Sequence, residues 1–462
     1  MPDVAGVPYD ARMTVVRPED VARVRELIES GDLAALDAIL EPLHAADLAD
    51  ILRTLERSAQ IAILQRIDTD RAADVLTELD QQSGQSLLLL LSDRDVVDLL
   101  GEMPSDDAAD MMSTLPPEKT ERIGALLPDD DRRELEGLMK FDEDTAGGIM
   151  EVERVAVPLH ATVQDAINIV RAGADDVENL QKIYVVDERG ELRGQLNVLD
   201  LIMQRAATPV ADAMDTAVIR VPVDMDQEQV ANLFGKYDAF TLPVVDAAGV
   251  LVGRITVDDI IDVMEEEATE DIALLAGTTE DELGETSVLR VSRTRLPWLV
   301  AAMLGEALNA VVMSHHRTAL ETFVVLAFFI PLIVATAGNV GIQSSVVVVR
   351  EIALGHVDLR HVGRRVLREL TVALANGVVL GAILFCVVWL WQRNVGLGGL
   401  LFVSLFCVVL VAAFMGASVP LLLNRWKVDP AIAAGPFVTL SNDIVGLAIY
   451  LSLASAYLAR FG

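Results

Sequence analysis

The feature that most constrains this chain is a series of five long apolar segments in its last third. A helix needs roughly 20 apolar residues to cross a bilayer, and the segments cover about residues 297–314, 323–349, 370–391, 399–424 and 431–459. Glu306 and Asn309 interrupt the first of them. We therefore predict a multi-pass membrane protein in which residues 296–462 form a five-helix transmembrane bundle surrounded by the lipid bilayer.

Basic residues gather in alternate loops between these segments, and such loops stay on the cytoplasmic side. With five spans, the N-terminus is then cytoplasmic and the C-terminus lies on the outer side of the cell (inner) membrane. Residues 1–18 form an N-terminal tail without the basic and apolar regions of a cleavable signal. The loop residues are Arg290, Arg293 and Arg295 before the first segment, Arg350, Arg360, Arg364, Arg365 and Arg368 before the third, and Arg425 and Lys427 before the fifth.

Negative charge is concentrated in the part of the chain that precedes the membrane segments. The formal net charge is −34. From Pro297 onward there are 7 acidic and 10 basic residues, which leaves 63 acidic and 26 basic residues before it. So acidic a region repels nucleic acid and attracts cations, although solvation alone explains many such carboxylates. We expect no nucleic-acid partner. We also expect no enzyme, because the sequence lacks a Walker loop, an HExxH motif and a suitable Gly-x-Ser-x-Gly.

The first part of the chain carries an apolar pattern that repeats every 12 residues between 45 and 127. Twelve residues allow one short helix and a turn, so each unit must bury its apolar side against its neighbours. We predict a superhelical domain of short helices over 19–140, in which the repeated Asp50, Asp74, Asp98 and Asp110 cap helices or, alternatively, bind metal. The repeated pairs are Ile51–Leu52, Ile63–Leu64, Val75–Leu76, Leu87–Leu88, Leu99–Leu100 and Met111–Met112.

The middle of the chain contains two copies of one pattern, offset by 59 residues, over 141–205 and 206–268. Each copy predicts a strand, a glycine turn, a second strand and a helix, which resembles a tandem pair of CBS domains. That module pairs about a pseudo-twofold axis and often binds adenine nucleotides. In the second copy Gly253, Thr256 and Asp259 resemble its nucleotide contacts, with Thr256 toward a phosphate and Asp259 toward a ribose. The alternative is that Asp259, like Asp200 in the first copy, only caps a helix.

The connector that follows the second copy, residues 269–295, is predicted to be mostly helical. The end of the second copy and the beginning of the connector are strongly acidic, with Glu266 and Glu267 before the boundary, Glu270 and Asp271 after it, and no lysine in the connector. Facing carboxylates of this kind can share a divalent cation. We therefore expect the connector to respond to cations.

Polar residues inside the apolar segments are costly in a bilayer and are candidates for function. Asn339 and Gln343 are four residues apart in the second segment and share a helix side. In the fifth, Asp429 stands at the entrance, and Asp443 lies one turn from Thr439 and two turns after Pro436. Mg²⁺ keeps several waters when it binds to protein. Two copies of Asp443 across a twofold axis could hold a hydrated ion, which favours a homodimer.

Specific motifs occur in the order found in the MgtE family of magnesium channels and transporters, which the chain resembles from about residue 20 to its end. They include Ala45–Asp50, Asp144–Met150, Glu266–Asp271, Arg295–Trp298 and Gly338–Ser344, and the Asp429-Pro430-Ala431 motif followed by Pro436, Thr439 and Asp443. Ala337 stands where the family often has glycine, and Glu306 is an acidic residue unusual for the first span.

The resemblance implies a homodimeric Mg²⁺-selective channel that is gated by cytosolic Mg²⁺, with possible ATP binding at the CBS pair. Asp443 would be the selectivity carboxylate and Asp429 would lie at the cytosolic mouth. Regulatory ions would bind acidic residues of the N domain, the CBS pair and the connector, called the plug. These residues are Asp93, Asp95, Asp258, Asp259, Glu266, Glu267, Glu270 and Asp271. Broader transport of Co²⁺ or Mn²⁺, and a membrane-anchored nucleotide sensor that conducts no ions, remain alternatives.

Overall fold

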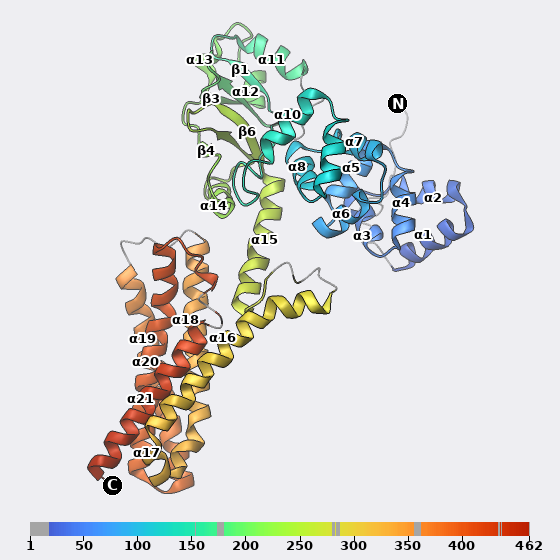
Figure 1. The fold of residues 1–462 in the computed structure, drawn as a ribbon. Helices are drawn as coiled ribbons and strands as arrows, with labels where there is room; N and C mark the ends of the chain where they lie inside the picture. The colour runs from blue at the N-terminus through green and yellow to red at the C-terminus, as the bar shows by residue number, and fades with distance from the viewer. Residues whose placement is uncertain are drawn as a thin grey trace, which may run out of the picture. The chain divides into compact units, whose positions relative to one another are not determined.

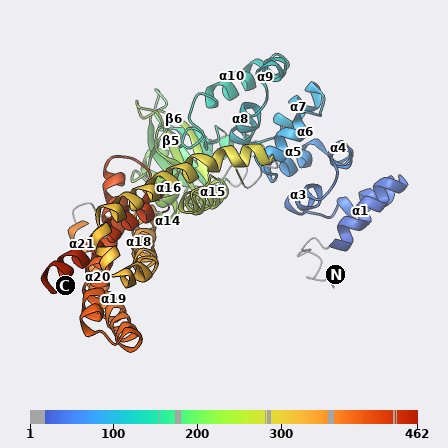
Figure 2. The same cartoon turned by 60° about the horizontal axis from the view of Figure 1, so that its bottom comes forward.

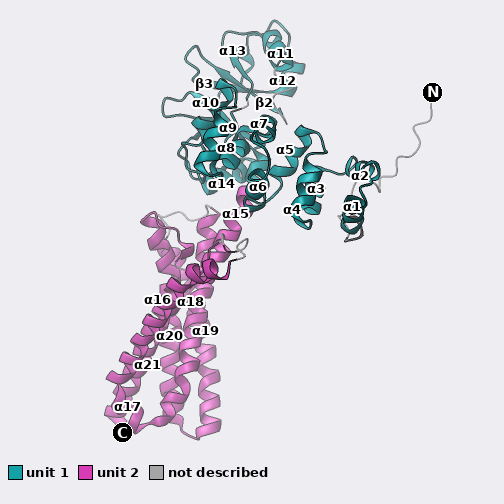
Figure 3. Cartoon of the chain, turned by 45° about the vertical axis from the view of Figure 1, so that its right-hand side comes forward, with its two compact units in different colours: residues 1–261 teal, residues 262–462 magenta. Residues whose placement is uncertain are grey.

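The structure is a computed structural model that describes residues 18–152, 154–172, 180–279, 282, 287–354, 362–432, 435 and 437–461. The chain divides into two compact units, residues 1–261 and 262–462 (Figure 3). We call the first the acidic unit and the second the membrane unit, and describe each by itself.

The acidic unit begins with ten helices, which follow one another in chain order in Figures 1 and 2. From α2 onward their N-caps recur every 12 residues: Asp32, His44, Glu56, Asp68, Asp80, Ser92, Pro104, Pro116 and Pro128. The helices are α1 (Pro18–Ser30), α2 (Leu33–Leu40), α3 (Ala45–Arg53), α4 (Arg57–Leu64), α5 (Thr69–Thr77), α6 (Gln81–Leu88), α7 (Asp93–Leu100), α8 (Ser105–Ser113), α9 (Pro117–Gly124) and α10 (Asp129–Leu138).

The predicted repeat is confirmed, but the predicted role of its aspartates is wrong. All six apolar pairs are buried, and alternate helices pack together, such as α3 with α5 and α8 with α10. Asp50, Asp74, Asp98 and Asp110 lie in the second half of their helices and are exposed. In each of these helices the N-cap residue lies six positions before the aspartate, because the buried apolar pair lies near the end of the helix rather than at its start.

Side chains from later helices satisfy the carbonyl groups at the ends of earlier ones. Buried Lys119 on α9 donates to the carbonyl oxygen atoms of Leu88 and, at 3.1 Å, Leu91. Arg71 on α5 donates to the carbonyl oxygen of Leu40 at 2.7 Å. The last carbonyls of a helix have no partner within the helix, so these bonds fix one repeat to another.

Two three-stranded sheets follow, with the orders β1-β2-β3 and β4-β5-β6. In each, the first two strands are parallel and the last two antiparallel, as the predicted CBS repeat requires. The strands are β1 (Ala156–Pro158), β2 (Lys182–Val186), β3 (Leu192–Asn197), β4 (Val221–Pro222), β5 (Thr241–Val245) and β6 (Leu251–Thr256), and the helices are α11 (Val163–Ala172), α12 (Val198–Met203), α13 (Val210–Ala213), α14 (Gln227–Tyr237) and α15 (Val257–Ala276).

A reciprocal pair of hydrogen bonds relates the two copies. The amide of Leu192 donates to the carbonyl of Gly249, and the amide of Leu251 donates to the carbonyl of Gly190, both at 3.0 Å. Both glycines have a positive φ, 79° at Gly190 and 82° at Gly249, which glycine adopts without strain. The two bonds are equivalent under the 59-residue offset, because Leu251 corresponds to Leu192 and Gly249 to Gly190. The CBS pair therefore has the predicted pseudo-twofold relation.

The segment that enters the CBS pair bonds to the second sheet rather than the first. Ala146 and Gly147 donate their amides to the carbonyls of Met225 and Val223, at 2.7 and 2.9 Å. Glu151 exchanges backbone bonds with Arg254. The predicted first copy, 141–205, therefore starts with residues that share the core of the second copy.

The membrane unit holds five helices that are long and apolar enough to cross a membrane, counted over the residues that the structure describes: 288–315, 324–353, 362–392, 395–425 and 438–461. This agrees with the five predicted spans. The elements are α16 (Val288–His315), α17 (Arg317–Thr322), the 3-10 helix η3 (Val324–Phe329), α18 (Ile330–Ala353), α19 (Val362–Gln392), α20 (Val395–Arg425) and α21 (Val438–Phe461). Pro436, part of the predicted fifth-span motif, lies outside the described residues.

Glycines set the spacing between these helices. A Cβ at Gly416 on α20 would lie 2.3 Å from the carbonyl oxygen of Gly341 on α18. A Cβ at Gly305 on α16 would lie 2.2 Å from the side chain of Leu440 on α21. Small residues allow such close approach in membrane bundles. The helices α16, α18 and α21 are thereby held around the polar residues described next.

Candidate functional site

A buried carboxyl group lies inside the membrane unit, at Asp443 on α21. Its residue is only 7% exposed. A Cβ at Gly338 on α18 would lie 3.5 Å from Asp443 Oδ1 and 3.4 Å from Thr439 Cγ2, so the backbone of α18 faces both side chains. Thr439 Oγ1 donates to the carbonyl of Gly435 at 3.2 Å. The predicted pairing of Thr439 with Asp443 on one side of a helix is confirmed.

The predicted polar pair of the second span takes a different position. Asn339 and Gln343 on α18 are both exposed in a single chain. Within the described residues, no hydrogen bond joins either amide to Asp443. The two side chains share one side of α18, as their spacing predicts, but that side is an outer surface of this bundle.

At one end of the bundle, the end of α15 covers the approach to α21. Leu274 and Leu275 pack on Val349 and Ala431. A Cβ at Gly435 would lie 2.4 Å from the carbonyl oxygen of Leu275. The connector therefore rests on the segment that leads into the fifth span.

Two carboxylates meet at this end. Asp429 accepts a hydrogen bond from the amide of Ala431 at 2.7 Å. Burial, followed by the negative charge of Asp429, raises the pKa of the Asp271 carboxyl. The structure thus brings together one predicted connector residue and the predicted mouth residue. No spacing in the sequence could relate them, because they are far apart in the chain.

The other predicted regulatory residues are more scattered. Asp258 is exposed, as are Glu266 and Glu270 on α15, while Glu267 is half-buried. In the N domain, Asp93 Oδ2 is 2.8 Å from Arg122 Nε, and this hydrogen bond lowers the pKa of Asp93. Asp93 therefore already has a cationic partner. Asp95 lies in the same first turn of α7, where its amide bonds to Ser92 Oγ at 3.2 Å.

A buried carboxyl that the sequence did not single out is Asp106, in the first turn of α8. It is 6% exposed, and its Oδ1 has no hydrogen-bond partner. Burial raises its pKa well above the usual range, and the charges of Asp259, Asp107 and Glu151 add to the effect. Burial also raises the pKa of Asp259. The sequence pattern does not distinguish Asp106, because the residues around it are as acidic as those around many exposed positions.

Asp106 lies near enough to Asp259 for the charge of Asp259 to act on it. The neighbouring Glu151 is neutralised by buried Arg254, with Glu151 Oε2 to Arg254 Nη2 at 2.6 Å. Ser105 Oγ accepts from the amide of Val152 at 2.9 Å, which fixes α8 against the CBS pair. A carboxylate oxygen that is buried without a donor suits a hard cation such as Mg²⁺. No group of three or more His, Cys, Asp or Glu could hold a metal within the described residues, so both candidate sites are pairs of carboxylates.

Two of the predicted nucleotide contacts bond to each other. The Thr256 hydroxyl donates to Asp259 Oδ2 at 2.6 Å and the Thr256 amide at 3.0 Å, so the two residues cap α15. The space in front of Gly253 is filled, since a Cβ there would lie 2.6 Å from the carbonyl oxygen of Glu151. In the first copy, Asn197 Nδ2 donates to Asp200 Oδ2 at 2.9 Å, which forms the equivalent cap.

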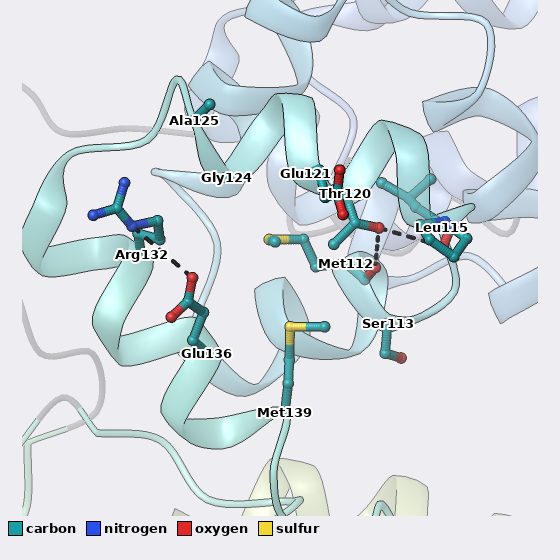
Figure 4. A pocket seen from close by; sticks show the side chains of 11 residues that line it. Met112, Ser113, Leu115, Thr120, Glu121, Gly124, Ala125, Arg132, Glu136 and Met139 are labelled. Atoms are coloured by element: carbon teal, nitrogen blue, oxygen red, sulfur yellow. Dashed lines mark hydrogen bonds and ion pairs between the residues drawn. The ribbon is translucent and has the colours of Figure 1, made fainter.

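A cavity of about 810 Å³ lies among α8, α9 and α10 of the N domain (Figure 4). Figure 4 shows Arg132 and Glu136 of α10 turned toward each other at its edge, with Met112 and Met139 nearby. None of the predicted site residues lines it. Its mixture of apolar and surface polar groups identifies no ligand.

Comparison with known families and solved structures agrees with this architecture. The model of the MgtE family, described as divalent cation transporter, matches residues 330–453. The model of the MgtE intracellular N domain matches 43–144, and the CBS domain model matches the second copy, 210–266. A crystal structure of the cytosolic domain of the Mg²⁺ channel MgtE in complex with ATP covers 53% of this chain and 99% of that one, with 37% identity and a TM-score of 0.51.

Curated relatives match most of the chain. The magnesium transporter MgtE of Thermus thermophilus is 40% identical over 325 residues, which are 70% of this chain and 72% of that protein. The magnesium transporter MgtE of Enterococcus faecalis is 36% identical over 328 residues, 71% of this chain and 72% of the relative. With this coverage and three family models matched in chain order, the chain belongs to the MgtE family of divalent cation transporters.

Proposed function

We propose that this protein carries Mg²⁺ across the cell membrane as a homodimer, and that Mg²⁺ on the cytosolic side closes the path. The observation that carries the proposal is the buried carboxyl of Asp443 within a membrane-spanning helix. A charged group at this depth costs roughly 2.5–3.5 kcal/mol on insertion scales. The only basic residue of α21 is Arg460 in its last turn, so a cation is the natural partner of Asp443.

The exposed polar side of α18 supports a dimer. Asn339 and Gln343 project from the outer surface of a membrane bundle, where lipid offers no hydrogen bonds. A second copy related by a twofold axis would turn both amides, and the approach to Asp443, toward a shared path. Twofold dimers are the commonest homo-oligomers. A hydrated Mg²⁺ could then be held through its waters by one carboxylate from each chain.

The two acidic pairs support regulation by the same ion. Asp271 with Asp429 lies at the end of the bundle that α15 covers, and Asp106 with Asp259 lies between α8 and the CBS pair. Without a cation each pair repels itself, which favours separation of the elements that carry it. Bound Mg²⁺ would hold the elements together and favour the closed state, which is a shift of population between two states. Asp258, Glu266, Glu267 and Glu270 would add to the attraction for cations around α15.

The side of the membrane follows from the distribution of arginines. The acidic unit and the end of the bundle that holds Asp271 and Asp429 would face the cytosol, and the C-terminus would face the outside. Transport of Co²⁺ or Mn²⁺ is the second candidate within the same class. A nucleotide sensor that conducts no ions would leave Asp443 without a role.

Flux measurements on purified protein in liposomes test the proposal. An Mg²⁺-sensitive dye inside the vesicles should report entry with the unaltered protein and little or none with Asp443→Asn. Glu321→Gln is the matched control, because Glu321 is an exposed carboxylate of the same unit that pairs only with Arg317. Equal Mg²⁺ entry through folded, dimeric Asp443→Asn would contradict the proposed path.

A further inference from the structure

A second carboxyl group stands beside Asp443 in the membrane unit, at Glu306 on α16. The two carboxyl groups lie within reach of each other. The contact depends on Gly305, whose missing side chain lets α16 lie directly against Leu440, three residues before Asp443. Two carboxyl groups held this closely can coordinate one ion together.

An amide oxygen in the same cluster has no donor. Asn309 Nδ2 donates to Glu306 Oε2 at 2.9 Å. Asn309 is 8% exposed, and its Oδ1 is buried without a hydrogen-bond partner. A buried acceptor that lacks a donor costs about 1–3 kcal/mol. The orphan oxygen belongs to the amide that contacts Glu306, so the surroundings of the two carboxyl groups leave a buried acceptor unsatisfied.

The position of Glu306 also argues against a role in packing alone. In a single chain Glu306 is exposed, in the middle of an apolar helix whose neighbouring Met303 and Leu304 are 63% and 61% exposed. A carboxylate on such a surface is unfavourable in lipid. Its closeness to Asp443 instead connects it with the cation path of the proposed function.

We propose that Glu306 is a cation ligand of the path and helps to determine which divalent ions pass. With one carboxylate per chain, an ion can be held through its waters, whereas a pair of carboxylates can replace waters directly. Mg²⁺ loses water reluctantly, and Co²⁺ binds such protein ligands more tightly than Mn²⁺ does. The pair should therefore favour Co²⁺ and Mn²⁺ relative to Mg²⁺. This inference rests on the proposed function.

The test compares Glu306→Gln with the unaltered full-length protein in liposomes, using competition of Mg²⁺ with Co²⁺ and with Mn²⁺. Glutamine keeps the shape and can still accept from Asn309 and donate to Asp443. We expect the half-saturating Co²⁺ concentration to rise about tenfold or more, the scale of lost metal-site contacts, with a smaller rise for Mg²⁺. In an Asp443→Asn background the same substitution should change little, since coupled ligands are not additive.

Each outcome bears on either the inference or the function. Unchanged selectivity and affinity in Glu306→Gln, with Asp443→Asn inactive, would overturn the role of Glu306 and leave the proposed function intact. An equal loss for all three ions would mean that Glu306 only positions Asp443, which also overturns a ligand role. If Glu306→Gln fails to form the dimer, Glu306→Asp serves instead, because it keeps the charge but shortens its reach and should still shift the Co²⁺ to Mg²⁺ ratio. Mg²⁺ flux through Asp443→Asn equal to that of the unaltered protein would instead contradict the proposed function.

Discussion

At one end of the membrane unit Asp271 and Asp429 lie near enough for their carboxyl groups to interact, and burial and then the charge of Asp429 raise the pKa of Asp271. Leu274 and Leu275 hold the same end of α15 on Ala431 and Val349. Apolar packing thus favours contact at this end while charge opposes it. A cation that binds between the carboxyl groups would decide the balance.

The first prediction concerns this pair. Asp271→Asn removes both the repulsion and a ligand, so Mg²⁺ flux should be low even without cytosolic Mg²⁺ and should depend less on it. Flux at several cytosolic Mg²⁺ concentrations measures the effect, with Glu265→Gln as a control on the same helix. A steeper dependence on Mg²⁺ in Asp271→Asn would show that the pair does not control closure.

The raised pKa of Asp271 gives a second prediction, on pH. A carboxyl whose pKa is raised in the packed state stabilises that state most below its ordinary pKa, and this contribution is lost as pH rises through the raised value. Acidification of the cytosolic side should therefore close the path at low Mg²⁺. Asp271→Asn should remove that part of the pH dependence. Flux recorded from neutral pH downward, in both proteins, checks the sign.

The third prediction concerns Asp106. Asp106→Asn removes a buried carboxyl whose ionisation burial opposes and whose Oδ1 has no partner, and without Mg²⁺ it should stabilise the contact of α8 with the CBS pair by about 1–3 kcal/mol. Hydrogen exchange of residues 105–113 in the full chain measures this, with exposed Asp98→Asn as the control. In the presence of Mg²⁺ the unaltered protein should be protected more strongly than Asp106→Asn, because only the unaltered protein gains the bound cation. Loss of protection in Asp106→Asn under both conditions would mean that the carboxyl is structural.

Much of the fold could be predicted because it rests on periodic patterns. The 12-residue repeat, the 59-residue offset and the five apolar segments each reflect a spacing that the structure keeps, as Leu192 with Gly249 and Leu251 with Gly190 illustrate. The contribution of residues 144–152 to the second sheet could not be predicted, because strand partners depend on contacts between distant segments.

The candidate site was predictable only in part, for the same reason. Asp443 could be recognised as a candidate ion ligand simply because it is a carboxyl group within an apolar segment. Its partner Glu306 lies on another helix, and the pairing of Asp106 with Asp259 joins residues more than 150 positions apart. Sequence alone does not distinguish a helix cap from a phosphate contact at Thr256, because both use the same residue types.

A fourth prediction tests whether Thr256 acts as a helix cap or as a phosphate contact. Thr256→Val removes the hydroxyl that donates to Asp259 and should destabilise the start of α15 by about 1 kcal/mol, as caps usually do. It should leave the ATP affinity measured by calorimetry unchanged from that of the unaltered protein. Asp200→Asn, which alters the equivalent cap in the first copy, is the matched comparison. A large loss of ATP affinity confined to Thr256→Val would restore the phosphate contact.

The last prediction compares two glycines of α18 that face α21. A Cβ at Gly341 would lie 1.8 Å from Asn442 Nδ2, whereas one at Gly338 would meet Thr439 Cγ2 at 3.4 Å, an ordinary contact. Asn442 is 1% exposed and has little room to move. Gly341→Ala should therefore lower stability by about 1–3 kcal/mol through overpacking and reduce Mg²⁺ flux by displacing the adjacent Asp443. Gly338→Ala should keep most of its stability. Thermal unfolding in detergent and flux in liposomes measure both, and the reverse ranking would show that α18 and α21 are packed differently around Asp443.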